Sequence, residues 1–239
     1  MLLVTPEGGK LVRTPSYSPD NNRQQRSISV ILAADGSASA NIRTNYTGLQ
    51  QEPYRSVLHS LTNDQQREWL TKHLNLPSFD LHAFSFAEKR ARIPAVTETM
   101  TLSTRRWTSP SGSRLFLPLN LISPTSAAPV LTKSRRLPLV MTAAYDYEDT
   151  DTVTYVLPDG YSPEFLVQPQ VIEAKFGSYS ANVTVSGKQL VYTRRLRMHR
   201  GNYPAEAYTE YADFRKKVAK ADRGQLVLIK KELATATPK

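Results

Sequence analysis

Apolar and polar residues alternate along much of the last third of the chain, as they do in half-buried β-strands. The segment from Asp151 to Leu157 places Val153, Tyr155 and Leu157 on one face. Residues typical of a turn, Pro158-Asp159-Gly160, follow it. The alternation therefore predicts a strand that ends at this turn.

Three more apolar segments follow, joined by very short connections. They are Val171–Phe176, Ala181–Val185 and Leu190–Met198, with Gly177-Ser178 and Ser186-Gly187 between them. Short connections favour antiparallel neighbours, so these segments predict a three-stranded meander. Arg194 interrupts the apolar face of the last one, which otherwise carries Leu190, Tyr192, Leu196 and Met198.

A helix is predicted from about Pro204 to Arg223. Proline suits the first helical position, cations gather near the other end, and Gly224 provides a stop. Its apolar stripe consists of Tyr211, Phe214, Val218 and Ala221. The continuously apolar run Leu226–Ile229 then predicts a short strand that is covered on both faces.

The earlier part of the chain predicts further strands and two helical segments. Ile28–Leu32 and Ala38–Tyr46 alternate on either side of an Asp35-Gly36 turn. One helix runs through Val57, Leu58 and Leu61, and a second begins at a capping box made by Thr62 and Gln65. The segments Phe79–Phe86, Val96–Trp107 and Arg114–Leu119 have the pattern of strands.

These elements predict a mainly β fold, an antiparallel β-sandwich with about three helices. The segments Leu2-Leu-Val4 and Lys10-Leu-Val12 predict a small hairpin, and the polar segment from Thr14 to Arg26 predicts a linker. We therefore expect a hairpin and linker over residues 1–26, a sandwich domain over 27–231 and a flexible tail over 232–239. The Pro- and Ser-rich segment 123–137 is predicted to be a long loop, and it is the alternative place for a domain boundary.

Several short strings in the last third resemble a known region. They are Tyr147-Glu-Asp-Thr-Asp151, Val156-Leu-Pro-Asp-Gly160, Lys175-Phe-Gly-Ser-Tyr179, Tyr192-Thr-Arg-Arg195, Gly201-Asn-Tyr-Pro-Ala205 and Lys220-Ala-Asp222. This part of the chain resembles the C-terminal, uncharacterised β-rich region of bacterial multidomain transglutaminase-like proteins. The resemblance is strongest over residues 145–231 and implies a parent protein in the periplasm or cell envelope.

The amino-acid composition limits the reactions that this chain can carry out. The chain has no cysteine, which excludes disulfides and any cysteine nucleophile of the kind that a transglutaminase needs. No apolar run approaches the 18 or more residues of a membrane-spanning helix, and the N-terminus lacks the pattern of a signal peptide. We expect either a cytosolic protein or a segment whose targeting signal lies upstream, and the resemblance favours the second.

Two groups of charged residues are candidates for binding sites. The densest acidic cluster, Asp146, Glu148, Asp149 and Asp151, has oxygen ligands for calcium but lacks EF-hand spacing, so we interpret it as a solvated strand entry. The formal charge of +10 raises nucleic acid as a partner. The basic clusters, however, form no nucleic-acid motif, and we interpret them as solvated surface: Lys133 to Arg136, Arg194 to Arg200, and Arg215 to Lys217. Anionic lipid, envelope polysaccharide or an acidic neighbouring domain fits this charge equally well.

The remaining candidates are histidines and aromatic residues. The four histidines, His59, His73, His82 and His199, form no metal or catalytic motif, although Asp80 and His82 with a distant serine remain an alternative. Trp107 and the tyrosines suggest a carbohydrate platform, but most of them fall on predicted core faces.

We therefore predict no catalytic, cofactor-binding or metal-ligating residue and no enzymatic activity. The expected function is a non-catalytic accessory module whose partner is an upstream transglutaminase-like core of the same polypeptide. The alternative is an envelope module that binds carbohydrate or peptide; an independent hydrolase is a third and more distant reading.

Overall fold

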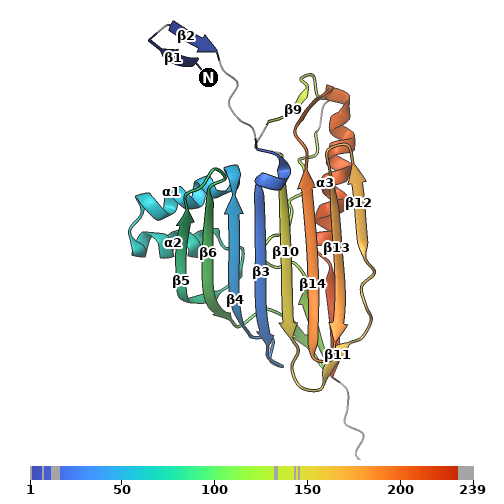
Figure 1. The fold of residues 1–239 in the computed structure, drawn as a ribbon. Coiled ribbons are helices and arrows are strands. Elements are labelled where there is room, and N and C mark those ends of the chain that lie inside the picture. The colour runs from blue at the N-terminus through green and yellow to red at the C-terminus, as the bar shows by residue number, and fades with distance from the viewer. Residues whose placement is uncertain are drawn as a thin grey trace, which may run out of the picture.

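The protein is described by a computed structural model that covers residues 2–6, 8–11, 17–131, 134–142, 144 and 146–230. Its main feature is an eight-stranded sheet with the strand order β12-β13-β14-β10-β3-β4-β6-β5 (Figure 1). In that order the strands are Gln170–Ala174, Gly177–Ser186, Gln189–Met198, Tyr147–Val156, Arg23–Leu32, Ala38–Thr47, Ala95–Thr104 and Phe79–Lys89. The fold is thus mainly β, as the alternating pattern predicts.

One strand pair departs from the expected antiparallel sheet. Strands β3 and β10 pair in parallel, with Val153 opposite Ile28, whereas their other neighbours in the sheet pair antiparallel. The sheet is therefore mixed, and the expectation of a purely antiparallel fold is wrong at this seam. Local sequence patterns contain no information about which distant strands pair, which is why the prediction missed it.

Strand β3 also begins earlier than its apolar pattern indicates. Residues Arg23 to Arg26 already pair with β10, and Gln24 to Arg26 also pair with β4, so they are strand and not the end of a polar linker. Their side chains are polar because they meet charged partners, and a pattern of apolar residues does not detect such a segment. The division of the chain at residue 26 otherwise stays a prediction.

A four-stranded sheet, β11-β16-β8-β7, packs on part of the large sheet. Its strands are Tyr161–Pro163, Gln225–Lys230, Arg114–Pro118 and Ser109–Ser111. In β16 the side chains of Leu226 and Leu228 are buried while Val227 and Ile229 are half-buried, so this strand is covered more fully on one face than on the other. Two short pairs complete the strands, β1–β2 (Leu2–Thr5 with Gly8–Leu11) and β9–β15 (Leu139–Met141 with Gly201–Tyr203).

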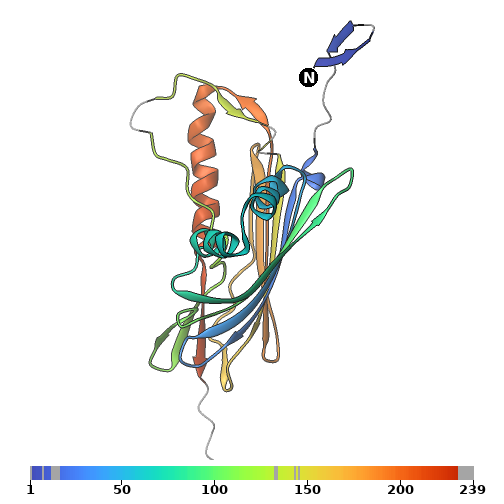
Figure 2. The same cartoon turned by 90° about the vertical axis from the view of Figure 1, so that its left-hand side faces the viewer.

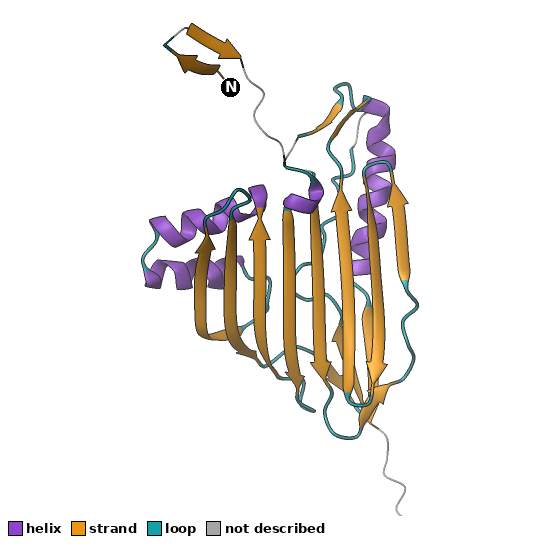
Figure 3. Ribbon diagram, viewed as in Figure 1, coloured by secondary structure: helices purple, strands orange, loops and turns teal. Residues whose placement is uncertain are grey.

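Three α-helices lie on the same face of the large sheet as the small sheet (Figure 2). They are α1 (Glu52–Ser60), α2 (Asn63–His73) and α3 (Tyr208–Asp222), as Figure 3 shows in purple. Short 3-10 turns cover residues Pro19–Asn21, Gly48–Gln51 and Ala205–Ala207. The predicted capping box is confirmed, since Thr62 and Gln65 bond to each other's backbone at the start of α2.

Two hydrophobic clusters fill the space beneath these elements. The larger one joins the large sheet to the small sheet, through residues such as Val30, Tyr155, Leu117 and Leu228. The second joins β13 and β14 to α3, through Phe176, Leu196, Phe214 and Val218 among others. The sandwich-like arrangement therefore has a sheet layer and a second layer made of helices and a smaller sheet.

The opposite face of the large sheet, called the outer face below, carries mainly short polar side chains, together with the exposed Ile31, Val156 and Val171. Within the described part of residues 17–230, no helix or second sheet covers it (Figure 2). Hydroxyl and amide groups bond to each other across its strands: Thr101 donates to Asn41 over 2.9 Å, and Ser85 and Thr99 lie 2.6 Å apart. The outer face is thus a broad, open and self-bonded polar surface.

The predicted N-terminal hairpin is present, with Leu3 opposite Lys10. Val12 and the tail from residue 231 lie outside the described residues, as do Lys133 and Tyr145. The described parts of segment 123–137 contain no helix or strand, as expected for a loop. Among the described helices, none has the length and apolar character needed to cross a membrane.

Candidate functional site

The acidic cluster predicted from the sequence lies at the entry of β10, but it is not solvated. Glu148 and Asp151 are only 1% and 2% exposed, and Asp146 is also buried. The prediction of a solvated strand entry is therefore wrong. The strand alternation sends Asp151 towards the interior and Glu148 towards the outer face, and each is covered by arginine side chains.

Strand register places a row of polar residues across the inner face of the large sheet. Thr44 lies opposite both Glu98 and Arg26, and Asp151 lies opposite both Arg26 and Arg194. We call the row Glu98, Thr44, Arg26, Asp151 and Arg194, together with Asp222 of α3, the polar belt. It crosses an interior that is otherwise apolar.

Arg194 is the centre of one half of the polar belt. Its Nη1 lies 2.9 Å from Oδ2 of Asp151, and its Nε lies 2.8 Å from Oδ1 of Asp222. Its Nη2 donates to Thr125 Oγ1 over 2.9 Å, and Asp222 also accepts from the Thr125 amide and the Tyr179 hydroxyl. One arginine thus joins two strands, the C-terminal turn of α3 and the 123–131 loop.

Arg26 has the same role in the other half. Its Nε donates to Thr44 Oγ1 over 3.0 Å, and its Nη2 donates to the Tyr46 hydroxyl over 3.2 Å and to Gln24 Oε1 over 3.3 Å. Its Nη1 lies 3.6 Å from Oδ1 of Asp151 and bonds to the Ser123 hydroxyl. Every donor nitrogen of this guanidinium therefore has a partner within the protein.

The ionisation of the belt follows from burial and pairing. Burial alone would raise the pKa of Asp222, but the charge and hydrogen bonds of Arg194 outweigh it and lower that pKa. Burial raises the pKa of Glu98 to about 7, against the charge of Arg26 and a bond to Tyr46. Burial likewise raises the pKa of Asp149 to about 6, although Gln50 donates to it over 3.0 Å. The charges of Glu98, in the polar belt, and of Asp149, beside it on β10, are therefore only partly compensated.

Glu148, on the outer face, is compensated more fully. Arg23 and Arg195 approach its two oxygens to 2.8 and 2.6 Å, and Arg197 lies 3.7 Å away. Burial would raise its pKa, but the hydrogen bonds from Arg195 and Arg23 lower it overall. Asp146, Glu148 and Asp151 therefore bind arginines, whereas Asp149 accepts from Gln50. Among the described residues, no group of three His, Asp or Glu side chains is placed to hold a metal ion.

The basic residues that the sequence predicts to be solvated fall into two groups, one in the interior and one at the surface. Arg194 is interior, so that interpretation is wrong for this residue, whereas the Arg195 side chain is 53% exposed and Arg200 pairs with Asp146 over 3.4 Å. Arg215, on α3, donates to the Ser126 carbonyl over 2.8 Å. These contacts do not test the expectation that nucleic acid is an unlikely partner, which stays a prediction.

The histidines lie apart in the described structure. His59 contacts Glu88, and His73 stacks on Trp69 with ring centres 4.3 Å apart. His82 Nε2 lies 2.8 Å from Ser103 Oγ on the outer face, so a histidine and a serine do meet there. None of the described hydrogen bonds joins Asp80 to His82, and both His82 and its contact with Ser103 are exposed. The pair therefore lacks the acid that orients the histidine in a catalytic triad.

Trp107 is not a surface platform. It is 1% exposed and meets Tyr155 edge-on, with ring centres 6.4 Å apart. Tyr46, Tyr179 and Tyr192 are buried as well. The prediction that most aromatic residues belong to the core is confirmed, and a carbohydrate platform built on Trp107 is excluded.

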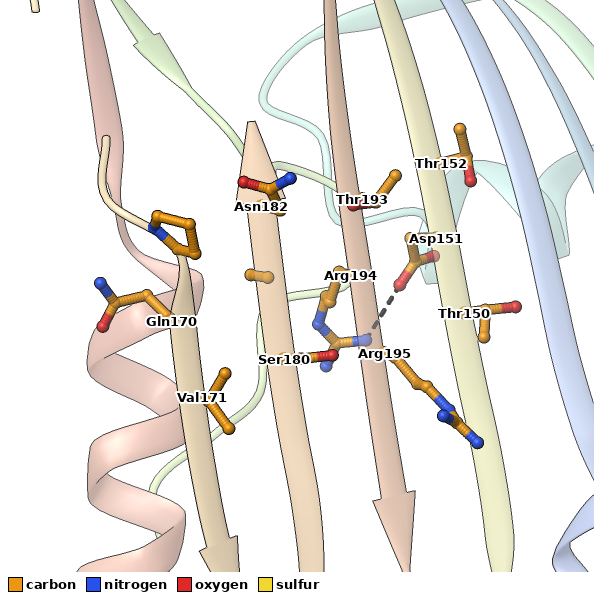
Figure 4. Close-up of a pocket in the computed structure, with 12 residues that line it drawn as sticks. Thr150, Asp151, Thr152, Gln170, Val171, Ser180, Asn182, Thr193, Arg194 and Arg195 are labelled. Carbon is orange, nitrogen blue, oxygen red and sulfur yellow. Dashed lines mark hydrogen bonds and ion pairs between the residues drawn. The ribbon is translucent and has the colours of Figure 1, made fainter. Parts of the chain in front are cut away.

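A groove of about 480 Å³ lies over β10, β14, β13 and β12 (Figure 4). Because Asp151, Ala181 and Arg194 point inward, their neighbours along the strands face the groove. These neighbours are Thr150, Thr152, Ser180, Asn182, Thr193 and Arg195, with Val171 at the β12 edge. The groove offers hydroxyl, amide and guanidinium groups but no buried nucleophile.

Sequence reasoning missed Arg26, Glu98, Thr125 and Asp222. For three of these residues the sequence does contain a signal, namely a charge at a position that the periodicity assigns to the core. Arg26 falls on the inward face of β3 with Ile28, Glu98 lies between Val96 and Met100, and Asp222 lies one helical turn after Val218. A charge at a position that the period assigns to the core indicates a buried partner. Thr125 lies in a loop and carried no such signal.

Comparison with known proteins finds one family to which part of this chain is similar. Residues 113–228 match DUF3858, a domain of unknown function with a solved structure. A crystal structure from Parabacteroides distasonis ATCC 8503, described as a putative protease, aligns over 89% of this chain and 100% of its own at 8% identity, with a TM-score of 0.35. Among curated proteins, none matches the sequence.

Proposed function

We propose that this chain is a non-catalytic accessory module that acts by binding a neighbouring part of the same polypeptide. The observation that carries the proposal is the pairing of the charged residues with one another. Arg194 is bound to Asp151 and Asp222 in the interior, and Glu148 is bound by arginines on the outer face. Ionisable groups that are paired in this way fix neighbouring elements relative to one another, and they are not free to move protons or attack a substrate.

The surface supports an interaction role. Five acids are buried among the described residues, namely Glu98, Asp146, Glu148, Asp151 and Asp222, whereas the one fully buried cation is Arg194. The accessible surface is consequently more basic than the formal charge of +10 indicates. Basic surfaces accelerate association with acidic partners in a salt-dependent manner. An acidic neighbouring domain is the partner that this charge and the resemblance to transglutaminase-like proteins favour together.

The parent is, in this proposal, a transglutaminase-like protein of the bacterial envelope, and this chain supplies no group to its reaction. The whole sequence contains no cysteine, so a thiol-dependent transamidation would have to take place elsewhere in the polypeptide. The match of residues 113–228 to a domain of unknown function is compatible with an accessory role.

Two measurements test the proposal. In the first, the chain is incubated in separate assays with a labelled amine plus a glutamine peptide, with casein, and with a serine-reactive fluorophosphonate. We expect no turnover of the peptide or of casein and no labelling by the fluorophosphonate. Ser103→Ala is the matched control, because labelling that disappears in this variant would reveal a serine nucleophile beside His82. In the second measurement, the chain is titrated against the transglutaminase-like region encoded with it. We expect binding that weakens as salt increases, and no binding at low salt would contradict the interaction role.

The groove on the outer face favours one other function, a module that binds an envelope carbohydrate or peptide. Its hydroxyls, amide and Arg195 are exposed and lie over four adjacent strands (Figure 4). Glycan fragments and peptides titrated into the isotopically labelled chain distinguish the two functions. Saturable shifts confined to Ser180, Asn182 and Thr193 would support the second function. Asn182→Arg should abolish those shifts, whereas Asn41→Arg, elsewhere on the same face, should not.

A further inference from the structure

A small cavity lies between the α1–α2 pair and the inner face of the large sheet. Its volume is about 70 Å³, which is enough for two or three water molecules or a group with one or two carbon atoms. The sheet contributes polar groups from Arg26, Tyr46 and Glu98. Aromatic and apolar side chains complete the lining: Tyr54, Trp69, Leu70, His73, Leu74, Met100 and Ile122.

Glu98 forms the acidic part of this lining and has no partner of opposite charge. It is 3% exposed, and among the described residues no lysine, arginine or histidine forms an ion pair with it. Arg26, whose charge acts on it, uses its donors on Thr44, Ser123, Gln24 and Tyr46 and faces Asp151. A hydrogen bond from Tyr46 and the charge of Arg26 compensate Glu98 only in part, so a buried carboxylate of this kind favours a proton or an added cation.

Aromatic rings form the outer part of the cavity. Tyr54 stacks on Tyr46 at 3.6 Å between ring centres and meets Trp69 edge-on at 5.7 Å. Tyr54 and Trp69 are half-buried and His73 is exposed, so the opening lies on their side. Aromatic faces attract cations, and the neighbouring Leu70, Met100 and Ile122 suit carbon atoms rather than a hydrated ion.

We propose that this cavity binds the protonated end of a small aliphatic amine, with Glu98 as its counter-ion and Trp69 and Tyr54 as its walls. A metal ion does not fit, because one carboxylate supplies too few oxygen ligands and the described residues hold no metal-binding group of three acids or histidines. An amine combines the single positive charge that Glu98 lacks with the apolar body that the remaining walls accept.

Methylammonium chloride is the probe, titrated at pH 8 with sodium chloride added to keep the ionic strength constant. Trp69 lines the cavity, so we expect a saturable change in tryptophan fluorescence and a rise in melting temperature. Tetramethylammonium, which exceeds the cavity, should give neither effect. Glu98→Gln keeps the shape and removes the charge, and it should weaken the response at least tenfold. Glu52→Gln, at an exposed position of α1, should leave the response unchanged.

The pH dependence in the unaltered chain is an independent check. The titratable and charged groups that face the site are Arg26, Tyr46, Tyr54, His73 and Glu98. Protonation of Glu98 disfavours a cation, so affinity should fall by about tenfold per pH unit once Glu98 is protonated. His73→Ala keeps Glu98 and should show the same fall, which would assign the fall to Glu98.

The source of the amine is resolved by a second ligand, Nα-acetyl-lysine methylamide. Binding of both ligands would indicate a lysine side chain on a partner, whereas binding of methylammonium alone would indicate a free amine. The proposal is overturned if the unaltered chain shows no saturation beyond the effect of sodium chloride. It is also overturned if Glu98→Gln responds as strongly as the unaltered chain, because the cavity then holds only water.

Discussion

Arg194 and Asp151 lie directly opposite each other on β14 and β10, with Nη1 and Oδ2 2.9 Å apart and both side chains only 2% exposed. The same guanidinium reaches Asp222 on α3 at 2.8 Å. A pair of strands and a helix that are distant in sequence are therefore fixed to one another by a single side chain. Its removal would leave the buried Asp222 without its cation and Asp151 with only Arg26, at 3.6 Å.

We expect Arg194→Met to destabilise the fold by about 3–5 kcal/mol, the cost typical of breaking a buried ion pair on one side. The neighbouring Arg195→Met is the matched control. Arg195 is half exposed, and Glu148 would keep Arg23 at 2.8 Å, so we expect a loss below about 1 kcal/mol. Urea denaturation of both variants measures the difference. Equal losses would show that the interior pair has no special role.

The stability of the fold should depend on pH through Glu98. Its pKa is raised by burial to about 7 in the folded chain, from an ordinary value of 4.5. Between these two values the folded chain binds the proton that the unfolded chain has released, so stability should fall as pH rises from about 4.5 to about 7. The loss is on the order of 2–3 kcal/mol. Asp149, with its pKa raised to about 6, acts in the same direction at lower pH.

Glu98→Gln should remove most of this slope and make the chain more stable than the unaltered protein at pH 8. Glu52→Gln, on the exposed side of α1, should keep the slope. Thermal unfolding from pH 4.5 to 8 is the measurement. Asp149 should still contribute a slope below about pH 6 in this variant. A slope between pH 6 and 7 that is as steep in Glu98→Gln as in the unaltered chain would mean that Glu98 is ionised within the fold throughout this range.

The two tryptophans should respond differently to a quencher. Trp107 is 1% exposed and Trp69 is half-buried. In Trp69→Phe the remaining emission should therefore be blue-shifted and weakly quenched by acrylamide, whereas Trp107→Phe should leave emission that is quenched several-fold more. Strong quenching in Trp69→Phe would place Trp107 on the surface and restore the platform interpretation.

Deletion of residues 1–13 should change the melting temperature by only a few degrees. In the described structure β1 and β2 pair with each other and with no strand of the other sheets, and a two-stranded hairpin is marginal by itself in water. The purified deletion variant, compared by circular dichroism with the full chain, tests this. Loss of cooperative unfolding would show that the hairpin contributes to the core.

Any affinity for DNA or RNA should be weak, independent of sequence and lost steeply between 50 and 200 mM salt, because the exposed lysines and arginines act through counterion release. A fluorescence-anisotropy titration at several salt concentrations measures it. Sub-micromolar affinity at physiological salt would indicate a dedicated site.

The local pattern predicted the elements well because each depends on nearby residues. The meander of β12, β13 and β14, the capping box at Thr62 and the helix that ends at Asp222 all follow from spacing within about 20 residues. The parallel pairing of β3 with β10 does not, since Arg23 and Glu148 are 125 residues apart. No periodicity links two such distant segments.

The polar belt was missed for a different reason. Charged residues were interpreted as solvated wherever they occurred, although Arg194 interrupts an apolar face that includes Tyr192 and Leu196 at neighbouring positions. Two or more charges of opposite sign at such positions in separate strands predict a buried pair. The partners themselves, here Asp151 for Arg194, still depend on strand register, which only the structure provides.

The parallel seam also has a consequence for synthesis. As the chain leaves the ribosome, β3, β4, β5 and β6 are complete long before Tyr147 begins β10. Until then β3 is an edge strand with its backbone groups unpaired, and such edges invite association with other chains. Its early residues, Arg23 to Arg26, carry two arginines and two glutamines. We therefore expect the side chains that later contact Asp151 and Glu148 to disfavour association of this exposed edge with other chains until β10 is synthesised.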